Sequence, residues 1–331
     1  MTHPISRFDA IDSAKGIGII LVVFGHAWRG AFGAGLIPDT ALFAAVDAGI
    51  YAFHMPLFFF LSGLLFLDTL KKYPTGTLLK GRVTRLLWPM ALWTWLFFGV
   101  KLLGGGALNN PVTLSDAPIL PLPPYEHLWF LWALFLCHTL LILLYAPVLR
   151  HIPPTVLRIG VGCIGLGLAF FLPQLPVPSL IWGPMVAHLP FFLIGMVIAD
   201  SQIEGTKARI TGFFAGCVFA GHMWLVVAGG SSTSPALTSC LLVIFGWMAW
   251  LQVDRGGDNA LLRILRYLGK VSMVIYLTHT IFSAALRIVM LRLGLDDPTL
   301  VLIGTTVIGL ILPLGVLWAA RRLRATRLLG F

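Results

Sequence analysis

The chain has 331 residues, of which 58% are hydrophobic and only 11% are charged. Because soluble globular domains carry about 25% charged residues, this composition excludes an ordinary soluble enzyme. The formal net charge is +10, but the Lys and Arg residues are dispersed between apolar runs, which argues against a nucleic-acid-binding surface.

Apolar runs long enough to cross a bilayer recur along the whole chain. A helix needs about 20 predominantly apolar residues to span the hydrocarbon core. We therefore predict an all-α polytopic membrane bundle that forms one integral membrane domain over residues 1–331. About ten transmembrane helices are expected, at residues 11–31, 48–68, 83–103, 127–146, 156–172, 180–199, 209–228, 236–252, 271–291 and 299–319.

The distribution of Lys and Arg predicts the orientation of these helices. Basic residues concentrate in the connections after the even-numbered spans and in the C-terminal tail, whereas the opposite side receives only Arg29, Lys101, Arg287 and Arg292. Since cytoplasmic loops carry an excess of Lys and Arg, we expect both termini in the cytoplasm. The longest connection, residues 104–126, is polar and Pro-rich, and is expected to cap one face of the bundle.

The first predicted span carries an ammonium near one end and an imidazole near the other. Lys15 and His26 are eleven residues apart, so both side chains share one helix face and lie about 16 Å apart along the axis. Polar groups inside a membrane helix cost free energy unless they have a buried or hydrated partner. This stripe predicts a site, with Lys15 in the cytoplasmic half and His26 in the outer half.

Each of these two residues also has a structural interpretation. His26 is alternatively a buried histidine that hydrogen-bonds to a neighbouring helix, and Lys15 a residue that extends to the lipid headgroups. Asp12, three residues before Lys15, is spaced to pair with it or to cap the helix start.

Spans two and three add further candidates. His54 opens the second span from the outer side, at a depth near that of His26, while Ser62 lies deeper, where a small residue more often permits close helix packing. Arg82 and Arg85, three residues apart, share a face at the start of the third span. The positive-inside rule alone places arginines there. Two guanidinium groups on one face also suit phosphate recognition.

Three more residues extend the candidate site. His127 lies at the outer start of the fourth span and is followed by Trp129, which is also typical of an interfacial aromatic belt. His279 lies within the ninth span. No two histidines have the tight spacing, such as i, i+4 on one helix, that a metal site needs, so we expect no metal.

Five segments of the chain are similar to the signatures of one known family. They are IDSAKGIGIILVVFGH from Ile11, FHMPLFFFLSG from Phe53, RVTR from Arg82, HLWFLWALF from His127 and GKVSMVIYLTH from Gly269. Together they resemble the acyltransferase-3 family of integral membrane O-acyltransferases, and its fucose 4-O-acetylase-like branch most. In the family, ten residues lie between the basic residue and the histidine, as between Lys15 and His26. That basic residue is usually Arg in the family. The ammonium of Lys15 cannot form the two parallel hydrogen bonds to a phosphate or carboxylate that a guanidinium forms.

The resemblance implies transfer of an acyl group, commonly acetyl from cytosolic acetyl-CoA, to a sugar hydroxyl. The catalytic residues would be His26, Lys15 and His54, with His26 as general base or as carrier of the acyl group. Lys15, Arg82 and Arg85 would bind coenzyme A. We expect an O-acetyltransferase of the bacterial inner membrane, with acetyl-CoA as co-substrate and no bound cofactor. Its other partners would be membrane lipids, and its acceptor an exopolysaccharide, an envelope glycan or a lipid-linked precursor.

A transporter or flippase for a glycan or lipid precursor is the alternative, in which the polar groups form a pathway. Many transporters contain inverted repeats. The nearest echo of the opening stretch is Lys270 to His279, but nine residues place these two side chains on opposite helix faces. The ninth span also enters from the same side as the first. The lack of a visible repeat disfavours a transporter.

Overall fold

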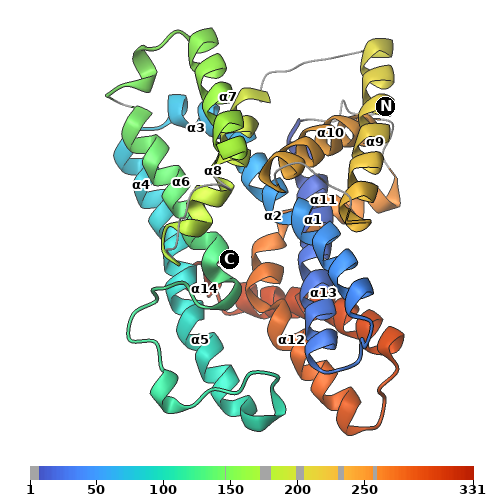
Figure 1. The fold of residues 1–331 in the computed structure, drawn as a ribbon. Helices are drawn as coiled ribbons and strands as arrows, with labels where there is room; N and C mark the ends of the chain where they lie inside the picture. Colours follow the sequence, from blue (N-terminus) through green and yellow to red (C-terminus); the bar gives the residue numbers. More distant parts are fainter. Residues whose placement is uncertain (1–6, 146, 172–179, 199–204, 230–234, 256–258) are drawn as a thin grey trace.

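The computed structural model describes residues 7–145, 147–171, 180–198, 205–229, 235–255 and 259–331 (Figure 1). These residues form helices and connections, without a β-strand. Among them, nine helices are long and apolar enough to cross a membrane. A tenth apolar helix, α8 (Gly183–Ile198), is shorter, with 16 residues. The predicted all-α membrane bundle is confirmed, and each predicted span overlaps one of these segments. The helices are α1 (Arg7–Gly33), α2 (Thr40–Leu64), α3 (Phe66–Lys72), α4 (Thr75–Arg82), α5 (Trp88–Gly104), α6 (Trp129–Tyr145), α7 (Pro154–Phe171), α8 (Gly183–Ile198), α9 (Gly205–Val227), α10 (Pro235–Arg255), α11 (Ala260–Lys270), α12 (Ser272–Arg292), α13 (Pro298–Arg322) and α14 (Thr326–Leu329).

Two helical segments begin earlier than their apolar runs. α2 starts at Thr40 and not at residue 48, because the Asp39 side chain accepts hydrogen bonds from the backbone N–H groups of Ala41 and Leu42 and caps the helix. The third segment starts with α4 and continues through the π-helical turn Val83–Leu87 into α5. Hydropathy locates the apolar part of a helix but not its cap or its polar first turns.

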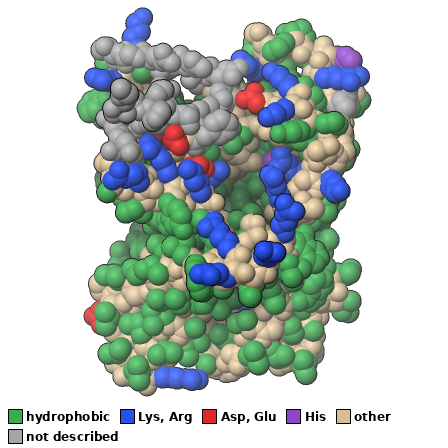
Figure 2. Space-filling model, turned by 180° about the vertical axis from the view of Figure 1, so that it is seen from behind, with side chains coloured by type: hydrophobic (Ala, Val, Ile, Leu, Met, Phe, Trp, Pro, Cys, Tyr) green, Lys and Arg blue, Asp and Glu red, His purple; other side chains and the backbone are tan. Residues whose placement is uncertain are grey.

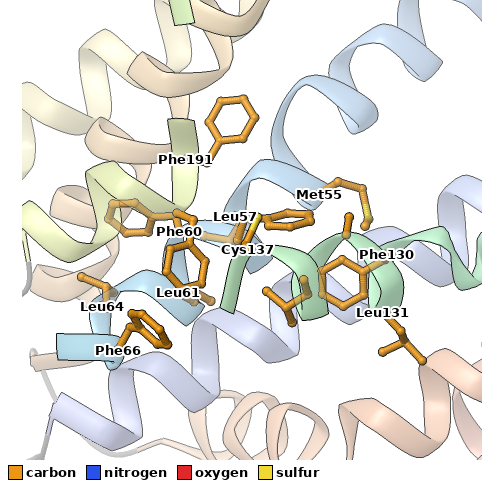
Figure 3. Packing of buried hydrophobic residues seen from close by; sticks show 14 of the residues in the cluster. Met55, Leu57, Phe60, Leu61, Leu64, Phe66, Phe130, Leu131, Cys137 and Phe191 are labelled. Atoms are coloured by element: carbon orange, nitrogen blue, oxygen red, sulfur yellow. The ribbon is translucent and has the colours of Figure 1, made fainter. Parts of the chain in front are cut away.

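The buried core is centred on α2, which packs against α8 and contributes Met55, Leu57, Phe60, Leu61 and Leu64 of the residues labelled in Figure 3. Two glycines permit this close contact. A Cβ atom on Gly63 would meet the backbone carbonyl of Phe192, and a Cβ atom on Gly195 would meet the backbone carbonyl of Phe60. This is the small-residue packing expected between membrane helices.

Replacing Gly195 by Val is expected to destabilise the bundle, because the new side chain collides with a backbone oxygen that no rotamer change can move. Overpacking a core costs about 1–3 kcal/mol, occasionally more. The unfolding temperature of the detergent-solubilised chain measures this effect. Gly167→Val on α7 is the matched control, since a Cβ atom there meets nothing within 4 Å. Equal unfolding temperatures for the two variants would contradict the close α2–α8 contact.

α1 is packed against helices from the C-terminal part of the chain, namely α11, α12 and α13 (Figure 1). No predicted span covers α11, which is amphipathic and lies between two membrane helices. Glycines bring its backbone against α1. A Cβ atom on Gly16 would meet the carbonyl of Leu265, and one on Gly269 would meet the carbonyl of Asp12. The part of α1 that carries Lys15 is therefore fixed by α11.

A buried charged group reinforces this junction. The Asp254 carboxylate of α10 is fully buried and accepts hydrogen bonds from the Ser13 hydroxyl at 2.9 Å and from Arg266 of α11 at 3.1 Å. Removing Arg266 would leave the buried carboxylate without its ion-pair partner, which is strongly unfavourable. This network joins α1, α10 and α11.

On one face of the molecule, charged side chains and hydrophobic side chains occupy different regions. Figure 2 shows Lys and Arg side chains around a hollow at mid-height and above it, whereas the lower half of that face is mainly hydrophobic. An apolar surface of this extent is expected for a protein surrounded by lipid.

Candidate active site

The two polar side chains of α1 line two different cavities. One cavity, of about 450 Å³, is lined by Lys15, Arg82 and Arg85, and we call it the Lys15 cavity. The other, of about 530 Å³, is lined by His26 and His127, and we call it the His26 cavity. The two polar residues predicted to share one face of the first helix therefore line two cavities, one with cationic side chains and one with imidazoles.

Three cations meet in the Lys15 cavity. Lys15 lies 3.4 Å from the carboxylate of Asp12, as their spacing predicts. Arg82 is half-buried, and its Nε atom is buried without a hydrogen-bond partner in the described part of the chain. Arg85, in the π-helical turn, is exposed. Since the described lining contains no Asp or Glu, the cavity carries an excess of positive charge that suits phosphate groups.

Ser62 faces the Lys15 cavity beside His138 of α6, a residue that sequence reasoning missed. The Nδ1 of His138 donates a hydrogen bond to the carbonyl of Leu134 at 2.8 Å. The other ring nitrogen, Nε2, therefore accepts the proton of the Ser62 hydroxyl, at 3.1 Å. The close helix packing predicted for the Ser62 region is provided by Gly63, while the Ser62 hydroxyl is directed to the cavity and His138.

Three histidine rings from three elements pack together beside the His26 cavity, which two of them, His26 and His127, line. The ring centroid of His26 lies 5.1 Å from that of His279 on α12 and 5.6 Å from that of His127. The rings of His127 and His279 are 5.4 Å apart. His127 occupies the 3₁₀ turn Glu126–Leu128, which leads into α6. Residues of the first, fourth and ninth predicted spans are thereby brought together.

Unpaired polar atoms surround this cluster. The Nε2 atoms of His127 and His279 and the Oγ1 atom of Thr280 are buried without a hydrogen-bond partner among the described residues. The Nδ1 of His279 donates to the carbonyls of Ile275 and Tyr276, both at 2.9 Å, so its Nε2 holds the lone pair in the neutral ring. An unsatisfied buried polar atom costs about 1–3 kcal/mol. A ligand rich in hydroxyl groups would remove this cost for His127 and Thr280, which line the cavity.

Tyr276 forms part of the wall between the two cavities. Its side chain lines the Lys15 cavity, and its hydroxyl donates a hydrogen bond to the backbone carbonyl of His127, which lines the His26 cavity. The two rings also pack edge to face, with centroids 5.2 Å apart. Sequence reasoning missed Tyr276, although its position three residues before His279 places both on one face of α12.

The 104–126 connection contributes residues to the lining of the His26 cavity, among them Leu108 and Asn109. Asn109 lines the cavity and donates a hydrogen bond to the carbonyl of Gly30 near the end of α1, at 3.2 Å. Glu126, at the end of the connection, forms an ion pair with Lys101 of α5 at 2.6 Å. The connection therefore belongs to the site and is not merely a link between spans.

Four predicted site residues are absent from the described linings of both cavities. Asp12 and His279 lie beside Lys15 and His26, respectively, and the other two are His54 and Trp129. His54 is buried, donates its Nδ1 to the carbonyl of Ile50 at 2.7 Å and contacts the ring of Tyr51. Trp129 packs against the ring of His188, with centroids 5.0 Å apart. A direct role for either residue stays a prediction. In the described part of the chain, no group of three or more His, Cys, Asp or Glu side chains has an arrangement that holds a metal ion.

The chain is similar to known proteins over most of its length. Residues 8–320 match the model of a family described as an acyltransferase domain. Two curated relatives are both named nodulation protein NolL. The one from Mesorhizobium japonicum is 31% identical over 141 residues, which is 41% of this chain and 35% of that protein. The one from Sinorhizobium fredii is 29% identical over 206 residues, which is 62% of this chain and 52% of that protein. The chain thus spans about a third to a half of the length of these relatives. No solved structure matches it.

Proposed function

The chain belongs to the acyltransferase-3 family and is a membrane enzyme of acyl transfer; from this premise we propose that it moves an acetyl group from cytosolic acetyl-CoA to a sugar hydroxyl. The acceptor sugar would belong to an exopolysaccharide, an envelope glycan or a lipid-linked precursor. The protein would act in the bacterial inner membrane, with the Lys15 cavity toward the cytoplasm, where acetyl-CoA is available.

The observation that carries this proposal is the division of α1 between two cavities. The Lys15 cavity offers three cations without a lining carboxylate, which suits the phosphates of coenzyme A. The His26 cavity offers unpaired polar atoms beside three imidazoles, which suits a hydroxyl-bearing acceptor. Lys15 and His26 are about 16 Å apart along the helix. The long pantetheine arm would cover this distance and bring the thioester past Tyr276 to His26.

His26 would act as the general base. In the proposed step it takes the proton of the acceptor hydroxyl while the oxygen attacks the thioester carbonyl. The carbon–sulfur bond then breaks, the acetyl ester forms, and the coenzyme A thiolate leaves and takes up a proton. The unpaired Nε2 of His279 is available to accept an N–H of His26, which would fix the ring orientation of the base.

Incubation of the purified chain with labelled acetyl-CoA and envelope glycan tests the function. The expected result is stoichiometric release of coenzyme A thiol and transfer of the label to the glycan as an alkali-labile ester. Movement of a glycan or lipid precursor across vesicles without consumption of acetyl-CoA would contradict the proposal and favour a transporter. Mass spectrometry of envelope carbohydrate from a deletion strain would then identify the acceptor.

A further inference from the structure

Among the described residues, the His26 cavity contains one cation without an acidic partner. Arg29 forms two hydrogen bonds with Asp47, at 2.6 and 2.8 Å, and Lys101 is paired with Glu126. Arg287 of α12 also lines this cavity, but no Asp or Glu of the described chain pairs with it.

Arg287 is buried in the protein and is not directed to the lipid surface. Its side chain is 8% exposed, whereas Arg292, at the end of the same helix, is exposed. An arginine that extends to headgroups or water would resemble Arg292. A buried guanidinium without a compensating anion is costly, which indicates that a partner is supplied from outside the chain.

The end of α1 does not supply that partner. The helix terminus has a partial negative charge, and Gly30 of α1 lies beside the guanidinium. The carbonyl of Gly30, however, already accepts hydrogen bonds from the N–H of Ala34 at 3.1 Å and from Asn109 at 3.2 Å. Arg287 is therefore not needed to cap this helix.

Gly30 fixes the position of the guanidinium relative to His26. A Cβ atom on Gly30 would collide with Nη1 of Arg287, so the absence of a side chain there makes room for the cation. Gly30 follows His26 by four residues, which places it on the same helix face and about 6 Å further along the axis. The guanidinium beside Gly30 and the imidazole of His26 therefore line the same cavity from one side of α1.

We infer that Arg287 forms a subsite for an anionic group, a phosphate or a carboxylate, which the acceptor carries close to the hydroxyl that is acylated; the inference rests on the proposed function. A planar guanidinium binds both oxyanions through paired hydrogen bonds. The acceptor class is thereby narrowed from any sugar to a sugar phosphate, including a lipid-linked one, or a sugar acid.

Calorimetric titration of the 331-residue chain in nanodiscs tests the subsite without acetyl-CoA. The probes are glucose 1-phosphate, glucuronate and the neutral methyl glucoside. At least one anionic probe is expected to bind about tenfold or more tightly than the neutral one, because hydrogen bonds to a charged group are strong. Arg287→Gln should remove this difference, and the exposed Arg292→Gln should retain it. The two anionic probes distinguish a phosphate from a carboxylate.

Gly30→Ala is the second variant, because its methyl group would displace the guanidinium while Arg287 itself is kept. It should weaken anion binding in the same way. In transfer assays, both variants should raise KM for the anionic acceptor with little change in kcat. Equal binding of charged and neutral probes by the unmodified chain, or a preference that survives Arg287→Gln, would overturn the inference. Arg287-dependent binding without any acetyl transfer would overturn the proposed function alone.

Discussion

Replacing His26 by Ala is expected to lower kcat for acetyl transfer by about 10²- to 10⁴-fold, the usual contribution of a general base. His26 is the member of the three-histidine cluster that lies on α1 and lines the His26 cavity. Its removal eliminates proton acceptance at the acceptor hydroxyl but leaves the Lys15 cavity intact. KM for acetyl-CoA should therefore change little. Steady-state rates with labelled acetyl-CoA measure both constants.

The matched control is His151→Ala, which removes an exposed histidine in the connection after α6. It should retain the rate of the unmodified chain. Unfolding temperatures show whether each variant is folded. A folded His26→Ala variant that acetylates the glycan at the normal rate would refute the role of His26.

A variant of His279 distinguishes the role of His26 as the base from that of a neighbouring residue that orients it. If His279 orients His26, His279→Phe should keep the ring packing but lose the free Nε2, and lower kcat less than His26→Ala does. When two catalytic groups act as one unit, the effects of removing each of them on kcat do not add up in the double variant. The double variant should then be no slower than His26→Ala. A multiplicative loss would indicate that the two histidines act independently.

The stripe on α1 was predictable because helical periodicity depends only on spacing. Eleven residues place Lys15 and His26 on one face whatever surrounds them. The Asp12–Lys15 pair was predictable for the same reason. The positive charge of the segment before α5, which carries Arg82 and Arg85, was also predictable. Local rules therefore identified which side chains point inward, and hydropathy located the membrane helices.

The tertiary part of the site was not predictable from these rules. His138 meets Ser62 across a separation of 76 residues, and Tyr276 meets the His127 carbonyl across 149. No periodicity within a helix relates residues so far apart. Arg287 was assigned only to the outer side of the membrane, because its position in the cavity depends on Gly30, which belongs to another helix. His54 has a similar depth by sequence, but it is turned toward Ile50 and Tyr51.

Replacing Arg82 by Gln is expected to raise KM for acetyl-CoA by about 10- to 100-fold, since a hydrogen bond to a charged group contributes about 1.5–3 kcal/mol. The Nε atom of Arg82 is buried and unpaired among the described residues, which leaves it free for a phosphate oxygen. Because the chemistry is placed at His26, kcat at saturating acetyl-CoA should change little. Measuring initial rates over a range of acetyl-CoA concentrations separates the two constants.

Lys80→Gln controls for the loss of one positive charge from the same helix. Lys80 also lies on α4 but is exposed, and the described lining of the Lys15 cavity does not include it. If the cations act only by attracting coenzyme A to the cytoplasmic face, both variants should raise KM equally and added salt should abolish the effect. If Arg82 binds phosphate directly, the Arg82→Gln effect should exceed that of Lys80→Gln and persist in salt. Arg82→Lys should then restore only part of the affinity, because an ammonium cannot reproduce the paired hydrogen bonds of a guanidinium.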